Sequence, residues 1–216
     1  MEPLEPIISV RLDNICDNEN AREIFDIATK EEEDIQNKQL IDLACKINCE
    51  NIGISKCKFI NCKCENSNFD KVYMSDIIFQ DCDFSNTKFM DSSFQRVSFI
   101  NCKIVGANFS NSNFGNVEIK ETMAKYANFN LSKFKDVKIS KSNLESATLE
   151  NVKFKNIKFY EDNLMLVNLF NTDLNNIDFT NSNIEGITLN LKDLRGAIVN
   201  EMQAIELAKI LGIRVK

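Results

Sequence analysis

A five-residue period dominates the sequence from about Gly53 to Asn200. Every fifth position holds a large apolar residue in most units, and all but two of the 16 Phe residues lie in this column. A second column, two residues earlier, holds small or β-branched residues such as Cys82, Thr87 and Ser92. Neither one long strand, with its period of two, nor a helix, with its period of 3.6, repeats every five residues.

The period predicts a solenoid whose chain turns a corner every five residues and always sends the same two side chains inward. Residues two apart on an extended chain share a face. Four such sides make a coil of about 20 residues, and stacked coils form parallel hydrogen bonds roughly 4.8 Å apart. One coil cannot bury its own apolar face, so stacking supplies the core. The expected core includes the Phe column members Phe79, Phe84, Phe89, Phe94, Phe99, Phe109 and Phe114.

The units Ala107–Asn111, Ser112–Asn116 and Ala127–Leu131 resemble the pentapeptide-repeat family. The family consensus is Ala, then Asp or Asn, then Leu or Phe, followed by two variable positions. The resemblance implies a mainly β fold, a right-handed quadrilateral β-helix whose central Phe or Leu side chains point to the axis. We expect this solenoid to span residues 47–200.

Residues 1–46 do not follow the period. Asp17 precedes the apolar residues Ala21, Ile24, Phe25 and Ala28 at helical spacing. Further apolar sets follow Pro6 and run from Ile35 to Ile47. The pattern predicts an acidic bundle of two or three short helices that caps the open first coil of the solenoid.

Residues 201–216 are predicted to form a helix and tail. Asn200 and Gln203 have the spacing of a capping box. The ending resembles that of the quinolone-resistance members of the family, in which it caps the solenoid and mediates a two-fold dimer. We expect a homodimer through the apolar stripe Met202, Ile205, Ala208 and Ile213. The alternative is a monomer in which the helix only caps the last coil.

The composition argues against an enzyme. The chain has no His, which excludes Ser–His and Cys–His nucleophiles within one chain, and no Gly-rich phosphate loop. We therefore expect no catalytic residues and no cofactor. Six of the eight Cys lie in the two inward columns and are expected to be buried free thiols: Cys57, Cys62, Cys82 and Cys102 in the small column, and Cys49 and Cys64 in the central one. A metal site at Cys62 and Cys64 is not expected, because they lack the usual ligand spacing. No run of 18 apolar residues and no signal peptide are apparent, so a cytoplasmic location without a membrane segment is expected.

Charge is distributed unevenly along the chain. Residues 1–46 carry a net charge of −7 against −6 for the whole chain, so residues 47–216 are close to neutral. Seven lysines that fall on two adjacent coils are expected to form one basic patch for an anionic partner. They are Lys133, Lys135, Lys138, Lys141, Lys153, Lys155 and Lys158. Two charges, Asp162 and Lys192, occupy the inward small column, where a bare charge is costly.

These observations favour a non-enzymatic scaffold that binds a protein partner, which the sequence does not identify. The family resemblance implies an alternative, a DNA mimic that binds DNA gyrase or another type II topoisomerase and gives drug resistance. A solenoid surface close to neutral imitates a phosphate ladder poorly. A third hypothesis is an anion or nucleic-acid binder that uses the lysine patch. Nucleic acid is disfavoured because the patch lacks Arg and stacking aromatic residues.

Overall fold

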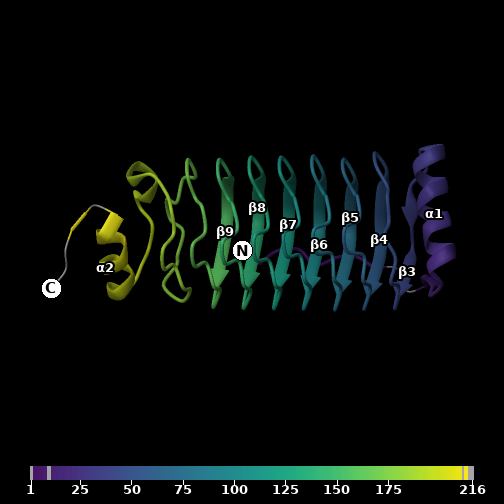
Figure 1. Cartoon of the computed structure of the whole chain (residues 1–216), viewed down its shortest axis with the longest axis horizontal. Helices are drawn as coiled ribbons and strands as arrows, with labels where there is room; N and C mark the ends of the chain where they lie inside the picture. The colour runs from purple at the N-terminus through teal and green to yellow at the C-terminus, as the bar shows by residue number, and fades with distance from the viewer. Residues whose placement is uncertain (1, 9–10, 211, 214–216) are drawn as a thin grey trace.

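The computed structural model describes residues 2–8, 11–210 and 212–213 of the chain. It is a parallel β-solenoid with a helix at each end (Figure 1). The strands are β1 (Asp13–Ile15), β2 (Ile35–Gln36), β3 (Lys38–Ile41), β4 (Gly53–Ile60), β5 (Tyr73–Gln80), β6 (Ser93–Ile100), β7 (Asn113–Lys120), β8 (Lys133–Ser140) and β9 (Lys153–Tyr160). The helices are α1 (Asn18–Glu31), the 3-10 turn η1 (Leu191–Leu194) and α2 (Glu201–Ile210).

Strands β4 to β9 stack in order, one per coil, and each residue pairs with the residue four repeat units later, as Gly53 does with Tyr73. Each of these strands covers two sides of its coil and bends at one left-handed residue in its middle. Asp76 in β5 and Asn116 in β7 have φ angles of 56° and 53°. Asn and Asp tolerate this region better than most residues, because their short polar side chains bond locally. The corner conformation thus explains why Asn and Asp are frequent at the last position of the repeat.

The Phe column forms the core, as predicted. Its seven expected members are at most 2% exposed. Several rings that are one coil apart stack, with centroid distances of 4.8 Å for Phe89–Phe109 and 4.9 Å for Phe94–Phe114. Rings on neighbouring sides meet edge to face, as do Phe89 and Phe94 at 5.8 Å. Both geometries are favourable for aromatic pairs, so the column is an aromatic stack along the axis.

The small inward column satisfies main-chain groups between coils. The amide of Ser92 donates to Ser112 Oγ at 3.0 Å, and Ser112 Oγ donates to the carbonyl of Phe89 at 2.8 Å. Cys62 and Cys82 occupy the same kind of position: the Cys62 amide donates to Cys82 Sγ at 3.4 Å. The prediction of buried free thiols in this column is confirmed for Cys57, Cys62, Cys82 and Cys102.

Helix α1 lies across the N-terminal end of the solenoid (Figure 1). Asp17 caps it, since its side chain accepts the amide of Asn20 at 3.0 Å. The buried Phe25 contacts Phe69 edge to face at 6.0 Å. The first apolar set of the N-terminal region therefore forms a helix that packs on the core.

The expectation of further helices in residues 1–46 is wrong. The segment from Ile35 to Ile47 forms β2, β3 and part of an additional coil, in which Ile35 pairs with Ile54 and Leu40 with Phe59. This register is one residue shorter than in the other coils, so the segment falls out of phase with the five-residue column. The segment after Pro6 is not helical in its described part either: residues 2–8 are extended and β1 pairs with β3.

The regular ladder ends at β9. Residues 161–200 continue to coil, but only isolated bridges join their coils, such as Asn163 with Asn183 and Asp178 with Ile198. Helix α2 then follows the last coil. Leu211 and residues 214–216 of the expected C-terminal tail lie outside the described residues.

Candidate partner-binding surface

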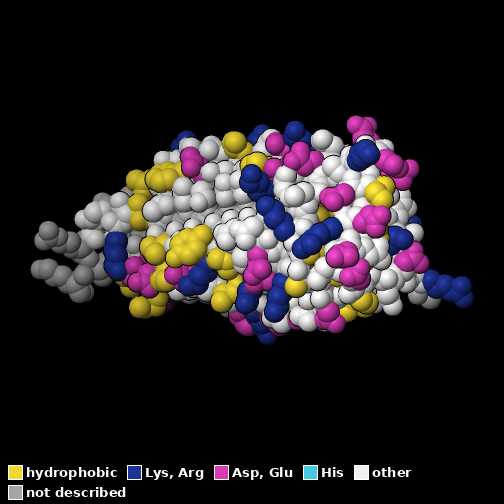
Figure 2. Space-filling view, turned by 45° about the vertical axis from the view of Figure 1, so that its right-hand side comes forward, with side chains coloured by type: hydrophobic (Ala, Val, Ile, Leu, Met, Phe, Trp, Pro, Cys, Tyr) yellow, Lys and Arg dark blue, Asp and Glu magenta, His cyan; other side chains and the backbone are white. Residues whose placement is uncertain are grey.

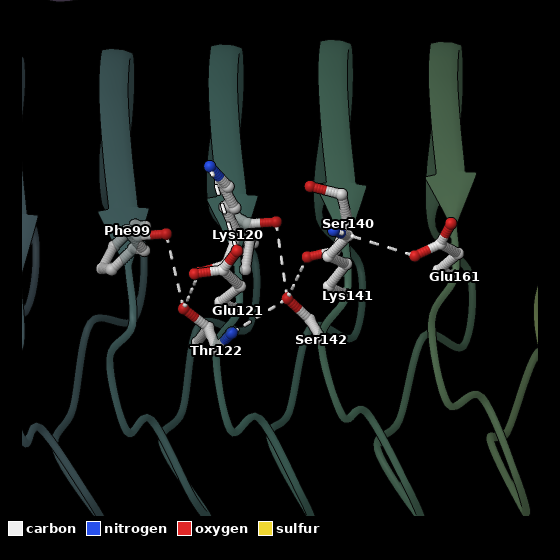
Figure 3. A network of polar contacts seen from close by, with 9 residues as sticks. Phe99, Lys120, Glu121, Thr122, Ser140, Lys141, Ser142 and Glu161 are labelled. Atoms are coloured by element: carbon white, nitrogen blue, oxygen red, sulfur yellow. Dashed lines mark hydrogen bonds and ion pairs between the residues drawn. The ribbon is translucent and has the colours of Figure 1, made fainter.

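Six of the seven predicted lysines lie side by side on β8 and β9. The pairing of the two strands places Lys133 opposite Lys153, Lys135 opposite Lys155 and Lys138 opposite Lys158. We call these six residues the lysine face. The seventh, Lys141, lies beyond the end of β8, where its ammonium is 4.0 Å from Glu161 (Figure 3).

The lysine face consists of like charges opposite each other on strands roughly 4.8 Å apart, an arrangement that destabilises a sheet. Lys133, Lys135, Lys153 and Lys155 are exposed, and none of the ion pairs found among the described residues involves them. Asp136, between the two sides, accepts a hydrogen bond from Asn156 Nδ2 at 2.7 Å. Folding alone does not account for this set of charges, so it is the first candidate for binding an anionic partner.

Residues 2–8, which we call the strap, cross the outside of the solenoid from β9 to β5 (Figure 1). The Glu2 carboxylate forms ion pairs with two lysines of the lysine face. Its Oε2 lies 2.9 Å from Lys138 Nζ, and its Oε1 lies 2.9 Å from Lys158 Nζ. Farther along, the Leu4 amide donates to Asn116 Oδ1 at 3.2 Å and the Ile7 amide to Asp76 Oδ1 at 2.9 Å. Sequence reasoning missed this contact, because no local pattern relates Glu2 to lysines that lie so far along the chain.

The strap changes the electrostatics beneath it. Hydrogen bonds from Lys158 and Lys138 lower the pKa of Glu2 to about 2, and Glu2 in turn raises the pKa of Lys138. At the other end, the Arg96 guanidinium binds both oxygens of Asp76 at 2.7 Å and lowers the pKa of that carboxyl group. Asp76 therefore remains an acceptor for the Ile7 amide over the whole neutral range.

The inner column contains one ionisable group of note, Asp162. In the preceding coils, hydroxyl groups line this wall: the Thr122 amide donates to Ser142 Oγ at 3.1 Å (Figure 3). Asp162 continues the column, accepting the amides of Ser142 at 2.8 Å and Tyr160 at 2.9 Å. Burial raises its pKa to about 7 despite these two donors. The other unusual inward charge, Lys192, is exposed, because η1 turns it out of the column.

Helix α2 is fixed to the last coil through Gln203. The predicted capping box is present, with the Gln203 amide donating to Asn200 Oδ1 at 3.0 Å and the Asn200 amide donating to Gln203 Oε1 at 2.9 Å. Gln203 Nε2 also donates to the carbonyls of Phe179 and Ser182 at 2.7 Å. The expected dimer residues stay accessible, with Met202 72%, Ile205 37% and Ile213 52% exposed and Ala208 half-buried. The dimer itself stays a prediction.

The described residues form neither a metal-ligand cluster nor a membrane-spanning helix. Within residues 2–8, 11–210 and 212–213, no group of three or more His, Cys, Asp or Glu side chains is arranged to hold a metal ion. Neither α1 nor α2, the α-helices of the described chain, is long and apolar enough to cross a membrane. Figure 2 shows that charged side chains of both signs gather toward the α1 end of the face in view, and apolar ones toward the C-terminal half.

The fold and its surface define a class: a parallel β-solenoid built from five-residue units, with charged side chains on its outer face. The model of the pentapeptide repeat region matches residues 52–129. Together with the register of the coils, this match identifies residues 52–129 as a repeat region of the pentapeptide-repeat family.

Solved structures with a similar fold include trypsin-treated QnrB1, a plasmid-mediated fluoroquinolone resistance protein. It is 22% identical, with 85% of this chain and 90% of that chain covered and a TM-score of 0.41. HetL of the cyanobacterium Nostoc, which is involved in the regulation of heterocyst differentiation, is 14% identical, with 76% and 84% covered and a TM-score of 0.37. No curated protein sequence matches the chain. At these identities and scores the similarities concern the fold alone.

Proposed function

We propose that this protein is a non-enzymatic scaffold that binds an acidic protein partner through the lysine face. The observation that carries the proposal is the register of β8 and β9, which sets three pairs of lysines directly opposite one another. The ladder holds the backbone of these lysines at fixed spacing. Binding of an anionic surface therefore costs the protein little conformational entropy. The interaction would act mainly through electrostatic complementarity, which favours rapid association.

Several features support a protein partner over nucleic acid. The lysine face contains no Arg, and the one exposed aromatic side chain on β8 and β9 is Tyr160 at the end of β9. Single-stranded nucleic acids are usually bound on several stacking aromatic residues beside a basic groove. The strap already shows a carboxylate between two of the lysines, which is the ligand that an acidic protein would present.

The proposal is tested by binding labelled poly-L-glutamate and, separately, duplex DNA. We expect wild type to bind polyglutamate with an affinity that falls as salt rises. Reversing Lys133, Lys135, Lys153 and Lys155 to Glu should reduce this affinity at least about tenfold, because four contacts become repulsive. The matched control reverses Lys56, Lys63, Lys71 and Lys88, exposed lysines elsewhere on the solenoid, and should retain most of the binding.

Two results would contradict the proposal. Equal loss of binding in the two quadruple variants would mean that only net charge matters. Tighter binding of DNA than of polyglutamate at the same charge concentration would favour the nucleic-acid hypothesis instead.

The DNA-mimic alternative is examined with a gyrase supercoiling assay. The described solenoid surface, with its net charge close to neutral and a lysine face, does not favour this function. We therefore expect neither inhibition of supercoiling nor protection from a quinolone at micromolar protein. Either effect would favour topoisomerase binding over the scaffold proposed above.

A further inference from the structure

The strap occupies its groove in the manner of a bound peptide. It is extended, and its four described polar contacts are made with β5 through Asp76, with β7 through Asn116, and with β8 and β9 through Lys138 and Lys158. Two of these contacts use only the main-chain amides of the strap. An extended chain of almost any sequence makes such contacts, whereas the pair of lysines requires a carboxylate.

We propose that this groove is a binding site for an extended acidic segment of the partner, and that the strap is its intramolecular occupant. The inference rests on the proposed function, since it specifies how part of the lysine face is reached. In the closed state Glu2 neutralises Lys138 and Lys158, and the other four lysines remain open. Displacement of the strap makes all six lysines of the lysine face available to the partner.

The groove is built to receive a ligand and not merely to hold the strap. Asp76 is 5% exposed and is fixed by both nitrogens of the Arg96 fork, so one acceptor for a main-chain amide is already in place. Ser98 on β6, 7% exposed, and Glu118 on β7 line the space between the strap and the strands. A rigid, preorganised groove costs its ligand less ordering than a flexible one.

The contacts of the strap are of the kind that a competitor displaces. Glu2 is 62% exposed at its side chain, and its two ion pairs lie at the surface, where salt and solvent weaken them. Leu4 and Ile7 are 61% and 65% exposed, so the strap buries little apolar surface in return for being ordered. Without Glu2, the like charges of Lys138 and Lys158 face each other with Glu118 of β7 as the remaining carboxylate beside Lys138, so a second anion is favoured in place of Glu2.

The experiment compares two strap variants of the full chain, Glu2→Gln and Glu5→Gln. They remove the same charge from the same segment, but only Glu2 pairs with lysines among the described residues. The probe is fluorescein-labelled octaglutamate, followed by anisotropy. We expect Glu2→Gln to bind the probe about 5–10-fold more tightly than wild type, because the competing closed state is weakened. Glu5→Gln should stay within about twofold of wild type, and the double reversal of Lys138 and Lys158 to Glu should bind at least about tenfold more weakly.

Amide hydrogen exchange supplies an independent measurement. Saturating octaglutamate should accelerate exchange of the Leu4 and Ile7 amides in wild type. Displacement of the strap breaks the hydrogen bonds that these amides donate to Asn116 and Asp76. Equal binding by wild type and both strap variants, or unchanged exchange at these amides under saturation, overturns the strap inference and leaves the proposed function standing. Absence of octaglutamate binding in wild type and in Glu2→Gln overturns both.

Discussion

Two stretches of the solenoid follow the same five-residue period but are held together differently. From Gly53 to Tyr160 a continuous ladder joins β4 to β9, and Phe rings stack at 4.8 to 5.3 Å in the best-aligned column. From Glu161 to Asn200 the central residues are mostly Leu and Ile, and isolated bridges replace the ladder. The period sets the path of the chain, but it does not guarantee the hydrogen bonds between coils.

The backbone at the junction explains the difference. In β9 the side that contains Phe154 has strand conformation, whereas one coil later the Ile177 amide closes a turn onto the carbonyl of Leu174 at 3.1 Å. The Lys141 amide still donates to the carbonyl of Tyr160 at 2.9 Å, but no equivalent bond from Glu161 to Thr180 is found in the described chain. Coils whose sides have different backbone conformations stack without a full ladder.

The largest effect should come from removing a ring in the middle of the stack. Phe109 lies between Phe89 at 4.8 Å and Phe129 at 5.1 Å. Phe109→Ala should lower the free energy of unfolding by about 3–5 kcal/mol, and Leu169→Ala, in the same column of the C-terminal stretch, by about 2–3 kcal/mol. Urea denaturation followed by circular dichroism measures both. Equal, small costs would show that the aromatic stack is not what distinguishes the first stretch.

The next effect concerns Asp162, the buried carboxyl group where the second stretch begins. Its folded-state pKa of about 7 lies above the ordinary value of 3.8, so its contribution favours the folded state most below pH 4 and is lost as pH rises through 7. Asp162→Ser restores the hydroxyl of the column. It should remove this pH dependence and add about 2 kcal/mol of stability at pH 8, part of the gain being offset by the lost acceptor of the Tyr160 amide.

Thermal unfolding of both proteins between pH 4 and pH 8 provides the measurement. The matched control is Asp173→Ser, which changes an exposed carboxylate of the same stretch to the same residue. A pH dependence that persists in Asp162→Ser would assign it to other groups.

The junction should also be visible without any mutation. In β7, Phe114 and Ile119 are paired with strands on both sides, whereas β9 has a strand partner on one side only within the described residues. The amides of Phe154 and Phe159 should therefore exchange with solvent about 100-fold faster or more than those of Phe114 and Ile119. Nuclear magnetic resonance or mass spectrometry measures this difference, and uniform protection across β7 and β9 would mean that the two stretches open as one unit.

The sequence predicted the core, α1 and the lysine register, but not the first coil or the strap. The column of Phe residues predicted the core, and the helical spacing of Ala21, Ile24, Phe25 and Ala28 predicted α1. The segment from Ile35 to Ile41 was misjudged because its coil is one residue short, which puts it out of phase, and its apolar spacing then resembles a helix. The lysine register on β8 and β9 followed from the period alone. The strap did not, since its contact with Lys158 depends on the path of the folded chain.

The smallest effect on stability, and the last contrast, concerns the two ends of the rod. At the N-terminal end α1 turns Phe25 inward, whereas at the C-terminal end α2 leaves Met202 and Ile205 accessible. An apolar helix face with a small contact to its own chain favours an isologous contact with a second copy.

We expect light scattering at tens of micromolar to give about twice the monomer mass of 24.7 kDa. Ile205→Glu with Ile213→Glu should restore the monomer with little loss of stability, since both side chains are exposed. The control, Tyr126→Glu with Leu131→Glu, places the same charges on exposed apolar positions in mid-solenoid and should leave the dimer intact. A wild-type mass of one chain would mean that α2 only caps the last coil.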